Sequence, residues 1–248
     1  MEVHHHAHTS GKKWTHYFWE FFMLFLAVTL GFFVENKREH FIEHQRENTF
    51  ARLLYDDLKK DTAWLKRVID VKEWRGKKID SMFYFMNLPD LQKNAAPIYY
   101  YCAFLFLDLS YSPNDVTIQQ LRSSGTLRYF DALELYNAIT LYYNDCNFYL
   151  ERETKLKKAI PTELRAKIFN SKEYSSMRGA PPDIMDAISY PVGKMKLLTT
   201  GKPVINEFLS YAVDEKLSNN FSKSLLRDVI APELKKLIVA IKDKYKLD

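Results

Sequence analysis

This 248-residue chain has few of the residues that tight turns and covalent cross-links require. Its 7 glycines and 9 prolines leave little material for the turns of a β-sheet protein, which favours helices. The two cysteines, Cys102 and Cys146, lie in apolar, aromatic sequence, so we interpret them as buried thiols rather than metal ligands or a disulfide framework. Glycine-rich phosphate loops, nucleophile elbows and Cys-x-x-Cys pairs are also missing, which removes the main sequence signals of nucleotide-dependent, hydrolytic and redox enzymes.

An excess of one charge is missing as well. Lysine and arginine number 36 and aspartate and glutamate 31, and the two signs alternate along most of the chain. A mild basic excess between residues 152 and 178 is typical of a solvated face, with acidic lipid headgroups as an alternative contact. Because no nucleic-acid reader motif accompanies this excess, we expect no nucleic-acid partner. Apolar residues make up 47% of the chain, which is enough for a packed core.

One long apolar run is present near the N-terminus. Residues 21–34 carry no charge, and together with residues 17–20 they would form about 27 Å of helix, close to the roughly 30 Å hydrocarbon core of a bilayer. Aromatic residues precede the run and Lys37 and Arg38 follow it, as at the two interfaces of a membrane helix. We predict that residues 15–35 cross the lipid bilayer once. A signal peptide, which would need a small-x-small cleavage site, and a buried core helix are the alternatives.

Three residues of this segment indicate contact with a second membrane helix. Glu20, Ala27 and Gly31 fall near one side of the helix, and Ala27 and Gly31 form a small-x-x-x-small pair that permits close approach. Glu20 lies either at the level of the headgroups or against the partner helix. Lysine and arginine are more numerous in residues 35–54 than before the run, which favours a cytoplasmic location for the bulk of the chain.

The predicted fold class is all-α, with the transmembrane helix continuing into a long helical stalk that packs with a helical bundle. We divide the chain into a flexible histidine-containing tail (1–14), the transmembrane helix (15–35), the stalk (36–88) and the bundle (89–248). Two coiled-coil-like seams recur in steps of 3 and 4, as in helices packed on other helices. They comprise Ala51, Tyr55, Leu58, Thr62, Leu65 and Ile69, and Ala132, Tyr136, Ile139, Tyr143, Cys146 and Leu150.

Proline, glycine and capping residues predict the remaining boundaries. The stalk helix should end at about Leu88, before Pro89. Residues 98–109 should form a buried helix that is apolar on all sides and too short for a second span. A short helix should follow Asn114 or Asp115 and break at Ser124-Gly125. Residues 170–203 should be irregular, followed by two helices at about 203–218 and 221–246.

The most specific candidate for chemistry is the pattern His-x-x-Glu-His at His40, Glu43 and His44, which has the spacing of inverted zinc proteases. In such sites the two histidines bind zinc and the glutamate activates a water. Here the pattern lies on a charged stalk helix with no evident third ligand, so a solvated face explains it better. The histidines of the tail (residues 4–8) could also bind metal, but without fixed geometry. The polar cluster at residues 119–125 is best explained as a helix end and turn.

Several motifs resemble one uncharacterised family of single-pass membrane proteins from Bacteroidetes-type bacteria. They are the start MEVHHH, the anchor HYFWEFFMLFLAVTLGFFVENKREH, the segments LLYDDLKKDTAWL and SPNDVTIQQLRSSGTLRYF, and the ending LIVAIKDKYKLD. The resemblance implies a bacterial inner-membrane protein with a helical soluble part, and it implies no activity. It also suggests that His4, His5 and His6 belong to the native sequence.

We therefore predict a membrane-anchored helical scaffold or interaction protein that forms homo-oligomers or binds a protein partner through its helical seams. We expect no enzymatic activity and no cofactor. Two alternatives from other classes remain: a metal-dependent membrane hydrolase that uses His40, Glu43 and His44, and a membrane-bound sensor or signalling component. A ligand cavity in the helical bundle would favour the sensor, and a fully packed core would count against it.

Overall fold

The computed structural model describes residues 14–130, 133–156, 159–179 and 181–247. The chain divides into two compact units, residues 1–50 and residues 51–248, and helix α1 (Trp14–Met86) contributes to both. The compact second unit therefore begins inside the segment that was predicted as a stalk. Of the tail predicted at residues 1–14, all but Trp14 lies outside the described residues, as do the histidines at residues 4–8.

In the first unit, the described chain is helical throughout. It holds an 18-residue window with a mean hydropathy of 1.9, no part of which is buried, and this makes α1 long and apolar enough to cross a membrane. The hydroxyl of Thr29, within the uncharged run at residues 21–34, donates to the Phe25 carbonyl at 2.8 Å, so this polar group is satisfied inside the helix. Phe18 and Phe22 stack one turn apart, with ring centroids 6.2 Å from each other.

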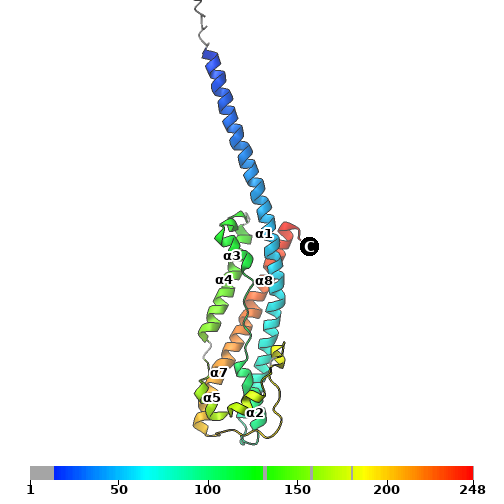
Figure 1. Cartoon of the computed structure of the whole chain (residues 1–248), viewed down its shortest axis with the longest axis vertical. Helices are drawn as coiled ribbons and strands as arrows, with labels where there is room; N and C mark the ends of the chain where they lie inside the picture. The colour runs from blue at the N-terminus through cyan, green and yellow to red at the C-terminus, as the bar shows by residue number, and fades with distance from the viewer. Residues whose placement is uncertain (1–13, 131–132, 157–158, 180, 248) are drawn as a thin grey trace, which may run out of the picture. The chain divides into compact units, whose positions relative to one another are not determined.

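The second unit is built around three long helical segments. These are α1 from Ala51 onward, α4 (Leu133–Leu156), and α7 (Lys202–Leu225) with α8 (Ala231–Tyr245), and Figure 1 shows them running alongside one another. Shorter elements connect and cap them: α2 (Ala95–Cys102), η1 (Ala103–Phe106), α3 (Val116–Ser123), η2 (Thr126–Tyr129), α5 (Thr162–Ile168), α6 (Ser171–Ser176) and η3 (Ile184–Asp186). In the described ranges the extended pairing is limited to one isolated bridge, Arg178 with Ile188. The all-α prediction is confirmed.

The local signals placed several boundaries correctly. Helix α1 ends at Met86, shortly before Pro89, because the residue before a proline is driven away from helical backbone angles. Gly125 follows α3 with a left-handed φ of 67°, a conformation that glycine adopts without steric cost. Irregular backbone makes up most of residues 170–203, with α6 and η3 as short helical turns within it. Helix α5 had not been predicted.

The C-terminal helices differ from the prediction. The break expected between residues 218 and 221 is wrong, because α7 runs on through a π-helical segment, Leu226–Ile230 (η4), into α8. Asn219, at the expected break, is buried inside the bundle instead, and so is Ser222 one turn later. The wider π turn precedes Pro232, whose ring would clash with the carbonyl four residues earlier in a regular α-helix.

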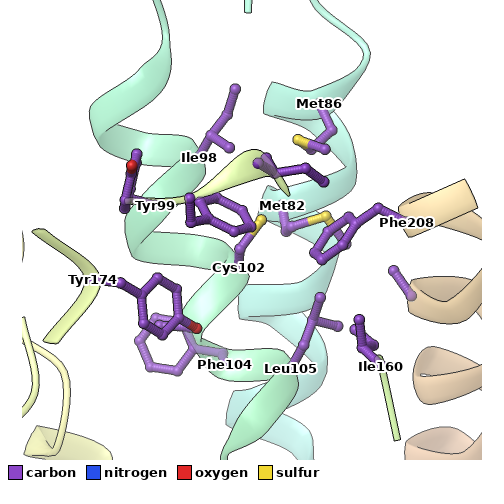
Figure 2. Close-up of a cluster of buried hydrophobic side chains, with 14 of the residues drawn as sticks. Met82, Met86, Ile98, Tyr99, Cys102, Phe104, Leu105, Ile160, Tyr174 and Phe208 are labelled. Atoms are coloured by element: carbon purple, nitrogen blue, oxygen red, sulfur yellow. The ribbon is translucent and has the colours of Figure 1, made fainter. Parts of the chain in front are cut away.

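An aromatic core fills the end of the second unit around α2 and η1. Helix α2 is buried as predicted, and its residues meet α1 and α7 in the cluster that Figure 2 shows. The rings of Tyr99 and Phe169 pack edge to face with centroids 5.0 Å apart. The Tyr99 hydroxyl donates to the Lys196 carbonyl at 3.0 Å and accepts from the Asn170 N–H at 2.7 Å, so one side chain fixes two irregular segments.

Candidate functional site

Two cations lie in the interior of the second unit. Lys72 and Arg75, on α1, are 1% and 2% exposed. They continue the buried seam of α1, which steps by 3 or 4 residues through Leu65, Val68, Lys72, Arg75, Ile79 and Met82. Burying a charge costs several kcal/mol unless partners compensate it. Both side chains therefore need carboxylates or other hydrogen-bond acceptors beside them inside the bundle.

Lys72 joins α1 to α4 and to the segment after η1. Its ammonium group lies 3.0 Å from Asp108 Oδ1 and also donates to Glu153, which in turn accepts a hydrogen bond from the hydroxyl of Ser110. Glu153 is the last residue of the buried seam of α4, which consists of Leu135, Ile139, Tyr142, Cys146, Tyr149 and Glu153. Lys72 and Glu153 therefore form a polar contact between the α1 and α4 seams, which are otherwise mostly apolar. We call Lys72, Arg75 and the side chains that pair with them the polar layer.

Arg75 joins α1 to η1 and α7. Its Nε and Nη2 donate to the carbonyls of Phe104 and Leu105 at 3.0 and 2.9 Å, where η1 ends and those carbonyls lack helical partners. Nη2 also lies 2.8 Å from Glu215 Oε2, and Nη1 donates to Asn219 at 3.2 Å. The guanidinium fork thus has a hydrogen-bond partner for each nitrogen.

A pocket of about 610 Å³ opens beside this polar layer. Its polar lining comes from Asp108, Ser110, Glu153, Thr154 and Glu215, and its apolar lining from Leu105, Phe106, Leu150, Ala159 and Ile160. The described lining residues include three carboxylates, Asp108, Glu153 and Glu215, each of which contacts Lys72 or Arg75 from the polar layer. A pocket with both polar and apolar lining suits a ligand that combines a polar group with an apolar body.

A second polar network fixes the segment Ser112–Asp115 against α1. Asp61 accepts hydrogen bonds from the Asn114 N–H at 2.8 Å and from the Tyr142 hydroxyl at 3.0 Å. Asp57 accepts from the Asn114 amide at 2.8 Å and from the Thr117 hydroxyl at 2.5 Å. Burial raises the pKa of Asp61 to about 6, although the two hydrogen bonds oppose that shift. The segments LLYDDLKKDTAWL and SPNDVTIQQLRSSGTLRYF therefore meet in space, and both Asp57 and Asp61 are buried.

An apolar groove of about 500 Å³ lies between α1 and α8. Helix α1 contributes Thr62, Leu65, Lys66 and Ile69 to its lining. Helix α8 contributes Ala231, Leu234, Lys235, Ile238 and Val239. Val239 is 49% exposed, so this apolar surface is reachable from solvent. Thr62 and Ile69 were predicted to lie in the packed seam of α1, but Thr62 is exposed and Ile69 half-buried because the seam follows Asp61 and Val68 instead.

The predicted metal residues lie in the first unit. His40 Nδ1 is 3.8 Å from Glu43, and His44 Nδ1 is 3.3 Å from Glu47, so each histidine faces a different carboxylate. Both histidine side chains are more than two-thirds exposed. Among the residues whose placement is described, no group of three or more His, Cys, Asp or Glu side chains is arranged to hold a metal ion. Nothing in the described geometry adds support for the metal-dependent hydrolase.

The predicted membrane-packing residues also lie in the first unit. Glu20 is 3.0 Å from His16, one helical turn earlier. Ala27 and Gly31 are exposed, and a Cβ added at Gly31 would meet no atom within 4 Å. Cys102 and Cys146 are both free and buried, as interpreted from the sequence. In the polar cluster at residues 119–125, Ser124 donates to the Gln120 carbonyl at 2.7 Å, the bond of a helix end.

Comparisons of the chain with protein-family models, with curated proteins and with solved structures found no match. The described structure itself defines an all-α protein with one helix long and apolar enough to span a membrane, and with a separate compact helical unit.

Proposed function

We propose that the chain is a membrane-anchored helical scaffold or interaction protein with residues 15–35 as its single span. The observation that carries this proposal is the window of α1 with a mean hydropathy of 1.9 and no buried part. Exposed apolar surface costs about 25 cal/mol per Å² in water, and lipid removes that cost. The family resemblance supports a bacterial inner membrane, and the excess of basic residues after the span supports a cytoplasmic location for the second unit.

Two surfaces support an interaction role. The first is the open face at Ala27 and Gly31, where a second helix can approach closely because neither residue has a large side chain. The second is the apolar groove between α1 and α8 in the second unit. We propose that the open face forms a homo-oligomer in the membrane and that a helical protein partner or a second copy uses the groove.

The oligomer is tested by sedimentation of the full chain in mild detergent, combined with cross-linking in native membranes. We expect wild type to associate and Gly31→Ile to dissociate about tenfold more readily, because the side chain holds the backbones apart. Thr29→Ile is the control, since it places the same isoleucine side chain on the opposite side of the same helix. A strictly monomeric wild-type chain that captures no partner on cross-linking would contradict the proposal.

The sensor is a second candidate, and the pocket of about 610 Å³ favours it. The pocket lies within the size range of small-molecule sites, about 300–1,000 Å³. Its lining takes residues from α4, α7 and the segment after η1, so an occupant would contact several elements of the second unit at once.

A further inference from the structure

A small cavity between α5 and α6 has two arginines and no carboxylate among its described lining residues. It measures about 150 Å³ and is lined by Thr162, Arg165, Ala166, Phe169, Ser171, Tyr174, Ser175 and Arg178. The cavity is smaller than the roughly 300–1,000 Å³ of sites for drug-sized ligands and several times the 30 Å³ that one water takes in the liquid. Its size therefore suits a single small polar group.

Aromatic rings hold Arg165 in place. Its guanidinium lies 5.0 Å from the centroid of the Phe106 ring and 5.7 Å from that of Tyr174. Tyr174 is itself 6% exposed and belongs to the core of Figure 2, so this support is rigid. A guanidinium stacked on a ring keeps its in-plane N–H groups available to a ligand. Within the described part of the chain, neither Arg165 nor Arg178 forms an ion pair with a carboxylate.

Backbone hydrogen bonds position Arg178. The Gly179 N–H donates to the Ala187 carbonyl at 3.0 Å, and the Ser189 N–H donates to the Met177 carbonyl at 2.9 Å. These bonds lie on either side of the bridge between Arg178 and Ile188. The backbone that carries the second guanidinium is therefore fixed before any ligand arrives, which lowers the entropy lost on binding.

Two hydroxyl groups in the lining can donate hydrogen bonds to a ligand, in addition to the two guanidinium groups. Ser175 is already engaged, because its hydroxyl donates to the Ser171 carbonyl at 2.7 Å. The hydroxyls of Thr162 and Ser171 make no hydrogen bond to any described residue, so both can donate to a ligand. Two bidentate guanidinium groups would already fill the four or so lone-pair positions of a carboxylate, and the two hydroxyls favour an anion with more oxygens.

We propose that this cavity, which we call the Arg165–Arg178 site, binds a phosphate-type oxyanion, either free phosphate or the phosphate of an anionic lipid headgroup. Glu163 and Glu173 neighbour the lining residues in sequence but do not line the cavity, and Lys167 and Lys172 offset their charge in the same segment. The site lies within the basic stretch at residues 152–178, and it gives two of those basic residues a specific role.

The test is calorimetric titration of inorganic phosphate into the full chain, held in nanodiscs of phosphatidylcholine. We expect saturable binding that weakens about tenfold or more in Arg165→Gln and in Arg178→Gln, because each change removes charge-assisted hydrogen bonds. Lys167→Gln is the matched control: it removes the same charge from an exposed position on α5 outside the cavity, and phosphate affinity should stay within about twofold.

Nanodiscs that contain phosphatidic acid distinguish the two sources of phosphate. If the headgroup occupies the site, these nanodiscs abolish binding of added phosphate in wild type; if only free phosphate binds, its affinity is unchanged. In wild type, phosphate or the acidic lipid should also slow modification of Arg165 and Arg178 by phenylglyoxal, a readout that requires no variant to fold. Equal loss in Lys167→Gln, or no saturable binding and no protection with either source, would overturn the proposal.

Discussion

Replacing Lys72 with methionine should strongly destabilise the second unit. The change keeps the length of the side chain but leaves Asp108 and Glu153 without the ammonium group that lies between them, and these carboxylates are only 13% and 10% exposed. Removing one partner of a buried ion pair costs about 3–5 kcal/mol, because the remaining charge stays desolvated. Since a domain of this kind is stable by about 5–15 kcal/mol, the variant should lose a large part of its free energy of unfolding.

The measurement is denaturant unfolding of the full chain in mild detergent, followed by circular dichroism and by tryptophan fluorescence. Lys77→Met is the control, because Lys77 pairs with Glu73 at 3.3 Å on an exposed surface and should contribute no more than about 1 kcal/mol. Lys72→Met combined with Glu153→Gln should recover part of the loss. A cost below about 1 kcal/mol for Lys72→Met alone would show that water already solvates these carboxylates and would refute the reasoning.

Two further predictions concern buried titratable groups. The pKa of Asp61, raised by burial to about 6 from an ordinary 3.8, means that the folded state holds an extra proton between these values. The free energy of unfolding should therefore fall as the pH rises from about 4 to 6, by at most about 3 kcal/mol, and Asp61→Asn should flatten this part of the curve; an unchanged slope would be inconsistent with a buried Asp61. Burial also raises the pKa of the Cys102 and Cys146 thiols, so neither should react with iodoacetamide at pH 8 until the chain unfolds. Mass spectrometry would detect labelling, and rapid labelling of the native chain would show that the core opens readily.

The sequence was sufficient for the features that local chemistry controls. Pro89 and Gly125 act on their own backbone neighbourhood, so the ends of α1 and α3 could be predicted from them. The apolar run at residues 98–106 is buried because no face of it could be left in water. In each case a few adjacent residues determine the outcome.

The polar layer was not predicted from the sequence, because the residues that pair with Lys72 and Arg75 come from distant parts of the chain. Lys72 and Arg75 are charged residues of the predicted stalk, and only their position on the seam through Val68 and Ile79 marks them as buried. The seam of α7 contains the same signal, since Glu215 and Asn219 interrupt its apolar residues. Following each seam to its end, polar residues included, would have indicated that charged side chains meet inside the bundle. Which charges pair depends on how the helices align, and a single sequence does not contain that alignment.

The π-helical segment at residues 226–230 determines which face of the last helix, α8, points into the core. A π turn accommodates one residue more than an α turn, and one residue corresponds to about 100° of rotation around the helix axis. The inward positions of α8, Leu234, Leu237 and Ile241, are therefore in phase with those of α7 only because the extra residue is present. Deleting one residue here would rotate α8 by about 100° and turn the side chains of Leu234, Leu237 and Ile241 away from the core. The length of this segment, more than its composition, is what the fold has to preserve.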